Sequence, residues 1–228
     1  GIMYQVSNFK VQYFKEVERK EDLEQELEDF WNYSRFLQKQ ANTAIISLID
    51  AHQDLEASNK NNERLRKLAD TDELTFLPNR RALNEKLDQI FERSYREKRY
   101  LGVEMLDVDN FKQVNDTYGH STGDDVLVLI GKVLKEICSE YIYTARYGGD
   151  EFVIVYDNMD DEAIKRNGAR VKDLLAQGIQ AVSLAVFTVS QGIYAKIPTE
   201  DNKVWDYTST ADAALYVTKK NGKNNLLL

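Results

Sequence analysis

The chain has 228 residues, of which 43% are hydrophobic and 30% are charged, and its formal net charge at pH 7 is −8. This composition is typical of a soluble globular protein, and the length suffices for one domain with an appended segment. The negative charge disfavours non-specific binding of nucleic acid, which requires a basic face, but it leaves room for a nucleotide ligand held by a few local cations or a metal ion.

The chain holds one cysteine, so it cannot form an internal disulfide, as is usual in a reducing cytoplasm. Its longest nearly apolar run, residues 44–49, is far below the about 20 residues of a membrane-spanning helix. No signal peptide is evident. We expect a cytoplasmic protein without membrane contact in this chain, and a start at Gly1 is compatible with the cytoplasmic part of a larger sensor.

A long helix is the first element expected, because no glycine or proline occurs between Ile2 and Leu77. From Leu23 to Ala69 the positions of one stripe step by alternating four and three residues, as in a heptad repeat. The first positions of these heptads include Leu27, Ala41, Leu48 and Leu55.

The heptad stripe has two interpretations. One is a parallel coiled coil between two chains, and the other is a helix folded back on itself as a small bundle. The coiled coil is favoured, because the repeat keeps one phase down to Ala69. We therefore expect residues 1–69 to dimerise the protein and transmit a signal, and residues 70–228 to form a separate domain.

The second segment begins where Pro78 stops the helical pattern and Asn79 offers an N-cap for the next helix. Strands and helices then alternate, with an antiparallel hairpin inserted. The expected elements are a strand at Tyr100–Asp107, a helix at Asp124–Cys138, a hairpin at 141–156, a helix near Asp160–Gln177, a strand pair around Val182–Lys196 and a helix near Ala211–Lys220. This order predicts an α+β fold, with helices flanking a central mixed, largely antiparallel sheet.

The hairpin carries the sequence Arg-Tyr-Gly-Gly-Asp-Glu-Phe at 146–152. Two glycines between β-branched and aromatic runs are typical of a tight turn, because glycine readily adopts positive φ. The next residues, Asp150 and Glu151, are two carboxylates that repel each other. By themselves they are either a solvated acidic turn or part of a site that needs negative charge.

Asp107 ends an apolar strand, where a carboxylate is either a helix cap or a ligand at the sheet edge, and Asp109 is the better candidate for the cap. If the strand of Asp107 neighbours the hairpin, Asp107 and Asp150 meet at one end of the sheet. Two such aspartates suit Mg²⁺ or Mn²⁺, which commonly bridge carboxylates and substrate phosphates.

The polar segment 109–125 contains Asn115 and Asp124, an amide and a carboxylate that could read the edge of a purine but that more often cap turns. The end of the last helix is basic. Its cations either face solvent and favour the helix dipole, or they neutralise phosphate. They are Lys219, Lys220 and Lys223.

Together these segments resemble the GGDEF family of diguanylate cyclases over about residues 70–228. The matching motifs, in the family's order, are Asp72–Arg80, Asp107–Lys112, Asn115-Asp116, Gly119-His120, Gly123-Asp124, Arg146–Phe152, and Asp212–Tyr216 with Lys219 and Lys223. The resemblance implies a fold like the palm of nucleotidyl cyclases and polymerases. It also implies that a homodimer with one GTP per protomer condenses two GTP into cyclic di-GMP and two pyrophosphates.

By motif position, Asp107, the carbonyl of Val108 and Asp150 would hold Mg²⁺ or Mn²⁺. Asp150 and Glu151 would lie at the reacting centre, where the 3′-hydroxyl attacks the α-phosphate. The residues implied for GTP are Asn115 and Asp124 with Leu74 and Leu127 for guanine, and the backbone of Phe111 and Lys112 with Lys219 and Lys223 for phosphates. Asp124 also argues for GTP over a mixed GTP and ATP product.

The chain departs from the family pattern at three places. Ser139 and Ile142 stand where product-inhibited members carry Arg and Asp, so we expect no primary inhibitory site and weak feedback inhibition. Phe76 replaces a usual glycine, and Lys223 stands where arginine is common, which keeps the charge but loses bidentate geometry.

Two other functions compete with catalysis. One is a non-catalytic GGDEF module that binds GTP or cyclic di-GMP and relays the signal through the helix. The other is a helical dimerisation scaffold. The intact acidic and amide positions argue against the non-catalytic module, and metal-dependent GTP binding would discriminate against the scaffold.

Overall fold

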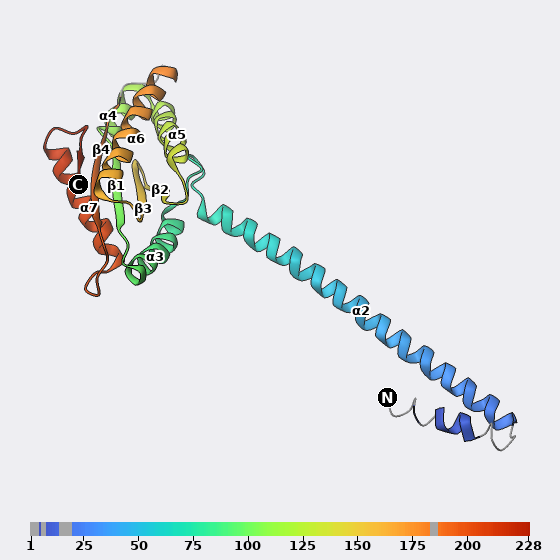
Figure 1. The fold of residues 1–228 in the computed structure, drawn as a ribbon. Coiled ribbons are helices and arrows are strands. Elements are labelled where there is room, and N and C mark those ends of the chain that lie inside the picture. Colours follow the sequence, from blue (N-terminus) through green and yellow to red (C-terminus); the bar gives the residue numbers. More distant parts are fainter. Residues whose placement is uncertain (1–4, 6–7, 14–19, 183–186) are drawn as a thin grey trace. The chain divides into compact units, whose positions relative to one another are not determined.

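The computed structural model describes residues 5, 8–13, 20–182 and 187–228, and Figure 1 shows its elements in chain order. Two compact units are present, Gly1–Leu65 and Arg66–Leu228. Within the described ranges, none of the helices combines the length and the apolar character that crossing a membrane requires.

The first unit is helical. Helix α2, Lys20–Asp70, confirms the expected long helix and continues into the second unit. Residues 8–13 are also helical, and Lys10 forms an ion pair of 3.5 Å with Glu26 near the start of α2. Two leucines of the heptad stripe are exposed to solvent in the single chain, Leu48 to 70% and Leu55 to 59%.

A five-stranded sheet in the order β2-β3-β1-β4-β5 forms the centre of the second unit. The strands are β1 Leu101–Val108, β2 Ile142–Gly148, β3 Glu151–Asp157, β4 Val189–Lys196 and β5 Leu226–Leu227. All neighbours are antiparallel except β4 and β5, which are parallel. The predicted α+β class with a mixed, largely antiparallel sheet is therefore confirmed.

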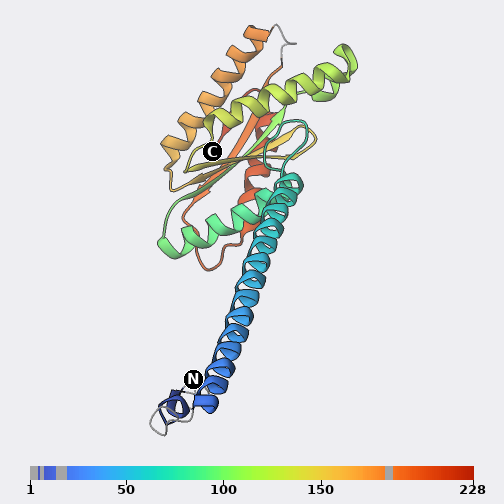
Figure 2. The same cartoon turned by 90° about the vertical axis from the view of Figure 1, so that its right-hand side faces the viewer.

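Helices cover both faces of this sheet (Figures 1 and 2). They are α3 Arg80–Glu97, α4 Phe111–Tyr118, α5 His120–Ile137, α6 Asp161–Val182 and α7 Val204–Lys220. Apolar residues of α3 and α7 form one core with β1, β2 and β3, while those of α4, α5 and α6 form the other core on the opposite face. The central strand β1 is buried along its whole length because both cores lie against it.

Several local predictions are confirmed and others are corrected. Asn79 caps α3, accepting from the backbone N–H groups of Arg81 and Ala82. The prediction of a strand pair around Val182–Lys196 is wrong. Val182 ends α6, and β4 pairs with the distant β1 instead of a local partner. Residues 183–186 of that prediction lie outside the described residues. Helix α4 and strand β5 were not predicted.

Candidate functional site

The acidic residues of β1 and of the hairpin meet at one end of the sheet. Because β1 and β3 are antiparallel, Asp107 lies directly opposite Glu151 in the register. The hairpin turn reaches the same end, where the Val108 N–H donates to the Asp150 carbonyl at 3.4 Å. The strands of Asp107 and the hairpin are therefore neighbours, as the prediction required, and their register brings Asp107 to the hairpin turn.

Asp107 is the most buried member of this acidic edge, at 6% exposure, whereas Asp150 and Glu151 are half-buried. Burial has the largest effect and raises the pKa of the Asp107 carboxyl to about 6. The hydrogen bond from Lys219 opposes the rise, while the charges of Asp150 and Glu151 add to it. A neighbouring cation would therefore stabilise the ionised carboxylates.

Lys219 supplies one such cation, with its Nζ 2.7 Å from Asp107 Oδ1. It reaches this place because α7 lies unusually close to β4. A Cβ added at Gly192 would come within 2.0 Å of the Leu215 backbone nitrogen and 2.4 Å of the Ala211 carbonyl. Only glycine permits this approach, so Gly192 brings the end of α7 over the acidic edge.

Lys223 lies beyond the end of α7, and its Nζ donates to Asn110 Oδ1. Asn110 is the N-cap residue of α4, and after it Phe111 is half-buried while Lys112 is exposed. The structure thus brings the two predicted phosphate-binding lysines to the region between the end of β1 and the start of α4.

The predicted base-reading residues lie where α4 meets α5. Asn115 is half-buried on α4, and its Oδ1 would be 1.9 Å from a Cβ added at Gly123 on α5. Asp124 is exposed directly after that glycine. The Asn115 Oδ1 is buried and has no hydrogen-bond partner within the described part of the chain, which is rare for a buried polar atom. In the core that contains α5, Leu127 is buried and Leu74 packs against the cluster.

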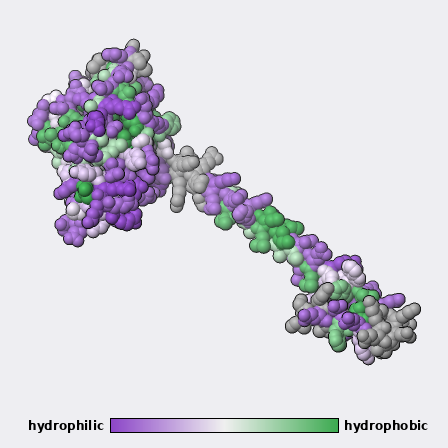
Figure 3. Space-filling view, in the orientation of Figure 1, coloured by the Kyte–Doolittle hydropathy of each residue, from purple (hydrophilic) through white to green (hydrophobic). Residues whose placement is uncertain are grey.

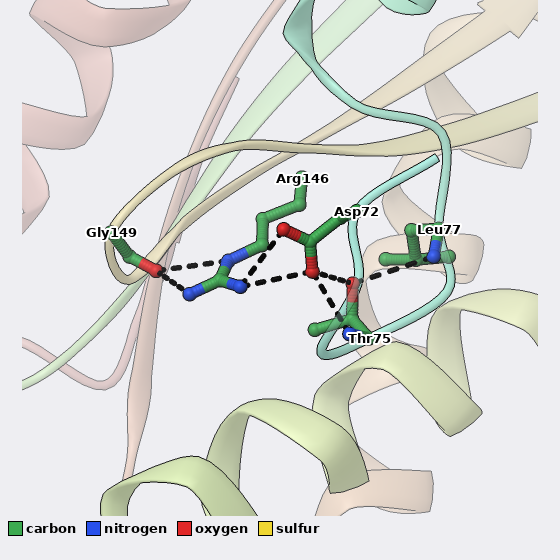
Figure 4. Close-up of polar contacts among 5 residues, drawn as sticks. All are labelled: Asp72, Thr75, Leu77, Arg146 and Gly149. Atoms are coloured by element: carbon green, nitrogen blue, oxygen red, sulfur yellow. Dashed lines mark hydrogen bonds and ion pairs between the residues drawn. The ribbon is translucent and has the colours of Figure 1, made fainter. Parts of the chain in front are cut away.

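A contact that the sequence did not reveal fastens the hairpin to the segment before α3 (Figure 4). Arg146 donates from Nη1 to both carboxylate oxygens of Asp72, at 2.9 and 3.0 Å, and from Nε and Nη2 to the Gly149 carbonyl at 3.1 and 2.7 Å. Asp72 also accepts from the backbone N–H and hydroxyl of Thr75. The turn that presents Asp150 is thereby held from outside the hairpin. The only feature of the sequence that hinted at this contact was an arginine just before a tight turn.

Phe76 follows this loop and has a φ of +54°, with its side chain 66% exposed. A positive φ is unfavourable for a residue with a Cβ, which explains why glycine is usual at this position of the family pattern. The departure therefore strains the loop slightly without changing its hydrogen bonds, because the Phe76 N–H still donates to the Asp72 carbonyl at 2.8 Å.

The positions of the expected inhibitory motif differ in environment. Ser139 is exposed, whereas Ile142 is a core residue of β2 at 5% exposure. The Ile142 side chain thus contributes to packing and offers no polar contact to a ligand.

The acidic edge has the donors that a hard divalent cation prefers, namely carboxylate oxygens with an adjacent backbone segment. Across the described residues, no three acidic, histidine or cysteine side chains are grouped so that they could hold a metal ion alone. Mg²⁺ usually takes one or two carboxylates and completes its shell with water and substrate phosphates. The residues present fit this mode of binding.

Comparison with known proteins agrees with this geometry. The family model described as "Diguanylate cyclase, GGDEF domain" matches residues 69–225. A diguanylate cyclase of Vibrio cholerae is 32% identical over 185 residues, which are 79% of this chain and 56% of that protein. The chain thus spans about half the length of this curated relative.

Two solved structures are similar in fold. The coiled coil and GGDEF domain of DgcB from Caulobacter crescentus, in complex with c-di-GMP, has a TM-score of 0.69 and 27% identity, covering 78% of this chain and 95% of that one. The diguanylate cyclase SiaD in complex with its activator SiaC, from Pseudomonas aeruginosa, has a TM-score of 0.69 and 30% identity, covering 98% and 84%. The chain belongs to the family of diguanylate cyclase GGDEF domains.

Proposed function

We propose that this protein is a diguanylate cyclase, which joins two GTP molecules into cyclic di-GMP and releases two pyrophosphates. The observation that carries the proposal is the acidic edge, where Asp107 pairs with a lysine from α7 and lies beside the hairpin residues Asp150 and Glu151. Carboxylates and cations at one sheet end are the groups needed to hold a metal–triphosphate complex. Such a substrate also suits the predicted cytoplasmic location.

In this proposal Asp107, Asp150 and the carbonyl of Val108 hold Mg²⁺ or Mn²⁺. The ion would supply charge neutralisation at the phosphates of the substrate. Glu151, which lies directly opposite Asp107 in the register, would accept the proton of the attacking 3′-hydroxyl. In the structure Lys219 pairs with Asp107. We infer that Lys219 exchanges this carboxylate for a phosphate oxygen when substrate and metal are bound.

The phosphates would be held by the backbone amides of Phe111 and Lys112 together with Lys219 and Lys223. Guanine would bind against Asn115 and Asp124, near Leu74 and Leu127. The unpartnered Asn115 Oδ1 supports this assignment, because guanine presents N–H donors on its Watson–Crick edge. Adenine presents a different pattern there, so we expect GTP rather than ATP as the substrate.

Gly123→Ala provides a test of the base site. The added methyl group meets Asn115 Oδ1 at 1.9 Å, so the Asn115 side chain must move. We expect a rise in KM for GTP of about tenfold, as for a lost base contact of 1–3 kcal/mol, with a smaller change in kcat. Steady-state kinetics measure this split. Gly178→Ala is a matched control, because its clash is with the flexible end of Leu129 on the core side of α6. Equal effects of the two variants would contradict the assignment.

We further propose that residues 1–69 form the dimerisation and signal-transmission segment. One domain binds one GTP, so the reaction requires two domains that face each other. A coiled coil raises the local concentration of the second domain to ~mM and fixes its orientation. The apolar stripe of α2 supports the proposal, because Leu48 and Leu55 are exposed to solvent in the single chain. Figure 3 shows hydrophobic residues at the surface of this helix.

Replacing both Leu48 and Leu55 with glutamate should disrupt this seam, because four buried carboxylates would face one another in the dimer. We expect the activity per molecule to fall by at least about tenfold at low protein concentration, as the effective concentration is lost. Sedimentation and activity would be measured together over a dilution series. The matched control is the exposed pair Gln53→Glu and Lys60→Glu, outside the stripe. Unchanged activity on dilution of the Leu48 and Leu55 variant would count against the dimer.

A non-catalytic module that binds GTP or cyclic di-GMP is the second candidate. The DgcB structure, a complex with c-di-GMP, shows that a similar domain can hold the product. In the present chain Ile142 is a core residue at the position of the expected inhibitory aspartate. We therefore expect weak product binding and weak feedback inhibition at that place.

Product analysis distinguishes the two candidates. The protein would be incubated with Mg²⁺ and GTP, ATP or both, and the nucleotides separated by chromatography. A cyclase forms cyclic di-GMP from GTP alone and no mixed product, and an Asp150→Ala variant forms none. A binding module leaves GTP unchanged while still retaining it on the protein.

A further inference from the structure

The turn after α7 has an unusual backbone. Gly222, Lys223 and Asn224 have consecutive positive φ angles of 110°, 61° and 47°. Such a conformation costs about 1–2 kcal/mol for most residues with a Cβ and less for asparagine, so Lys223 in particular needs contacts that hold the turn. Lys223, one of the two proposed phosphate-binding lysines, lies in the middle of this turn.

Asp109 supplies the contact that holds the turn. Its Oδ2 accepts the backbone N–H of Asn224 at 3.0 Å and the hydroxyl of Thr188 at 2.6 Å. Its Oδ1 accepts the hydroxyl of Ser190 at 2.7 Å. The residue is only 5% exposed. Asp109, the better candidate for a helix cap in the sequence, does not cap a helix, since α4 has Asn110 as its N-cap residue and no side-chain cap bond.

Asp109 therefore connects three parts of the site. It follows β1 two residues after Asp107, it is anchored to β4 through Thr188 and Ser190, and it fixes the turn that carries Lys223. The backbone adds to the β4 connection, because the Asp109 N–H donates to the Thr188 carbonyl at 2.9 Å. A carboxylate that accepts three hydrogen bonds in a buried place is rigid, and charge-assisted bonds of this kind are strong.

A second anchor holds the turn from α6. Lys172 Nζ donates to the Asn224 carbonyl at 2.6 Å. Both polar groups of the Asn224 peptide backbone are thus bound by charged side chains of other elements. The turn also leads directly into β5, where the Gln191 N–H donates to the Asn225 carbonyl at 2.9 Å. The start of the turn is tied to α7, because the Lys223 N–H donates to the Thr218 carbonyl at 3.2 Å. The contacts of Asn224 hold the other end, so together they set the direction of the Lys223 side chain.

We propose that Asp109 is a positioning residue for the triphosphate part of the substrate. Asp109 holds the strained 222–224 turn in place, so that Lys223 extends toward the start of α4. Asp109 itself touches neither substrate nor metal in this arrangement, since its oxygens are occupied by Thr188, Ser190 and Asn224. The inference rests on the proposed function for its ligand, and on the observed contacts for the clamp.

Two measurements test it. The first is the dissociation constant of a non-cleavable GTP analogue with Mg²⁺, compared with that of GMP, which lacks the β- and γ-phosphates. The second is the amide hydrogen exchange of residues 222–226 in the free protein. Both would be made on the wild type, Asp109→Asn, Lys172→Met and Lys165→Met. Lys165 is the matched control, because it lies on the same helix as Lys172 and contacts only Glu162 among the ion pairs of the described residues.

We expect Asp109→Asn to weaken binding of the analogue by about tenfold, the effect of losing hydrogen bonds to a charged group, with GMP binding changed less than about twofold. Lys172→Met should weaken the analogue by about threefold. Exchange at 222–226 should accelerate in both variants and not in Lys165→Met. If Asp109→Asn does not fold, the surface variant Lys172→Met decides the question by the same two measurements.

Some results would overturn the inference alone. In each case the wild type binds the analogue. The inference fails if Asp109→Asn binds the analogue with unchanged affinity, or if hydrogen exchange at 222–226 is unchanged in this variant. It also fails if Asp109→Asn loses analogue and GMP binding equally, which would show a general structural effect. A wild type that binds no analogue would instead overturn the proposed function and the ligand assignment. The exchange data would then still show whether Asp109 holds the turn.

Discussion

Asp107→Asn should abolish formation of cyclic di-GMP while leaving the domain folded. The variant keeps the shape of the side chain but removes the charge proposed to hold Mg²⁺. Metal stabilisation of phosphoryl transfer is worth several kcal/mol, so we expect kcat to fall by about 10³-fold or more. The measurement is product formation at saturating Mg²⁺ and GTP.

The stability of Asp107→Asn provides the control for folding. Burial and the neighbouring carboxylates raise the pKa of Asp107 to about 6, so above that pH, in the absence of metal, the ionised carboxylate is less favourable in the folded protein than in the unfolded chain. We expect the melting temperature of the variant at pH 8 to equal or exceed that of the wild type. Asp173→Asn, on an exposed position of α6, should change neither activity nor stability. Full activity of Asp107→Asn would refute the metal assignment.

The pH dependence of stability should be governed largely by Glu104, in the middle of β1. This carboxyl is completely buried, and it accepts hydrogen bonds from Tyr156 Oη at 2.7 Å and Gln191 Nε2 at 2.6 Å. Among the described residues no basic side chain forms an ion pair with it. Burial is the dominant effect and raises its pKa to about 7, although both hydrogen bonds oppose the rise.

A raised pKa in the folded state means that the native protein binds the proton more tightly than the unfolded chain does. The stabilisation by Glu104 is fully present below its ordinary pKa near 4.5 and is lost as pH rises through about 7. The difference corresponds to about 3 kcal/mol. Asp107 acts in the same direction, with its pKa of about 6.

Glu104→Gln should remove most of this pH dependence. The amide is neutral at every pH, and the Tyr156 hydroxyl can rotate to accept its N–H. We expect the wild-type melting temperature to be lower at pH 8 than at pH 5.5 by about 4–8 °C, because about 2 kcal/mol of the Glu104 contribution is lost between these two pH values in a protein of this size. The variant should lose most of that difference.

Calorimetry at four pH values between 5.5 and 8.5 would show the two slopes. Glu92→Gln, on the exposed side of α3, is the control and should keep the wild-type slope. Parallel slopes for the wild type and Glu104→Gln would contradict the assignment to Glu104.

The sequence was sufficient to predict the features that follow from local chemistry. Asn79 is a good cap before an apolar-periodic helix, and it caps α3. The alternation of apolar residues marked β1, and the glycine pair marked the hairpin between β2 and β3. The meeting of Asp107 with the hairpin needed one assumption, that their strands are neighbours, and the register of β1 and β3 satisfies it.

Features that depend on contacts between distant segments could not be read in this way. Asp109 resembled a helix cap because it precedes a polar helix, but its partners Thr188, Ser190 and Asn224 are far away in sequence. The same holds for the pair of Arg146 with Asp72. Gly192 gave no local signal either, since its role is set by the backbone of α7.

The dependence of the reaction rate on protein concentration tests the proposed dimeric cyclase. The rate of cyclic di-GMP formation per protomer would be measured with saturating GTP and Mg²⁺ at protein concentrations that span dimer dissociation, beside Asp150→Ala. We expect the rate per protomer to rise with concentration toward a plateau, and the variant to form no product. The proposal would be contradicted if the rate per protomer stayed constant down to concentrations at which the protein is a monomer. It would also be contradicted if Asp150→Ala formed cyclic di-GMP as fast as the wild type.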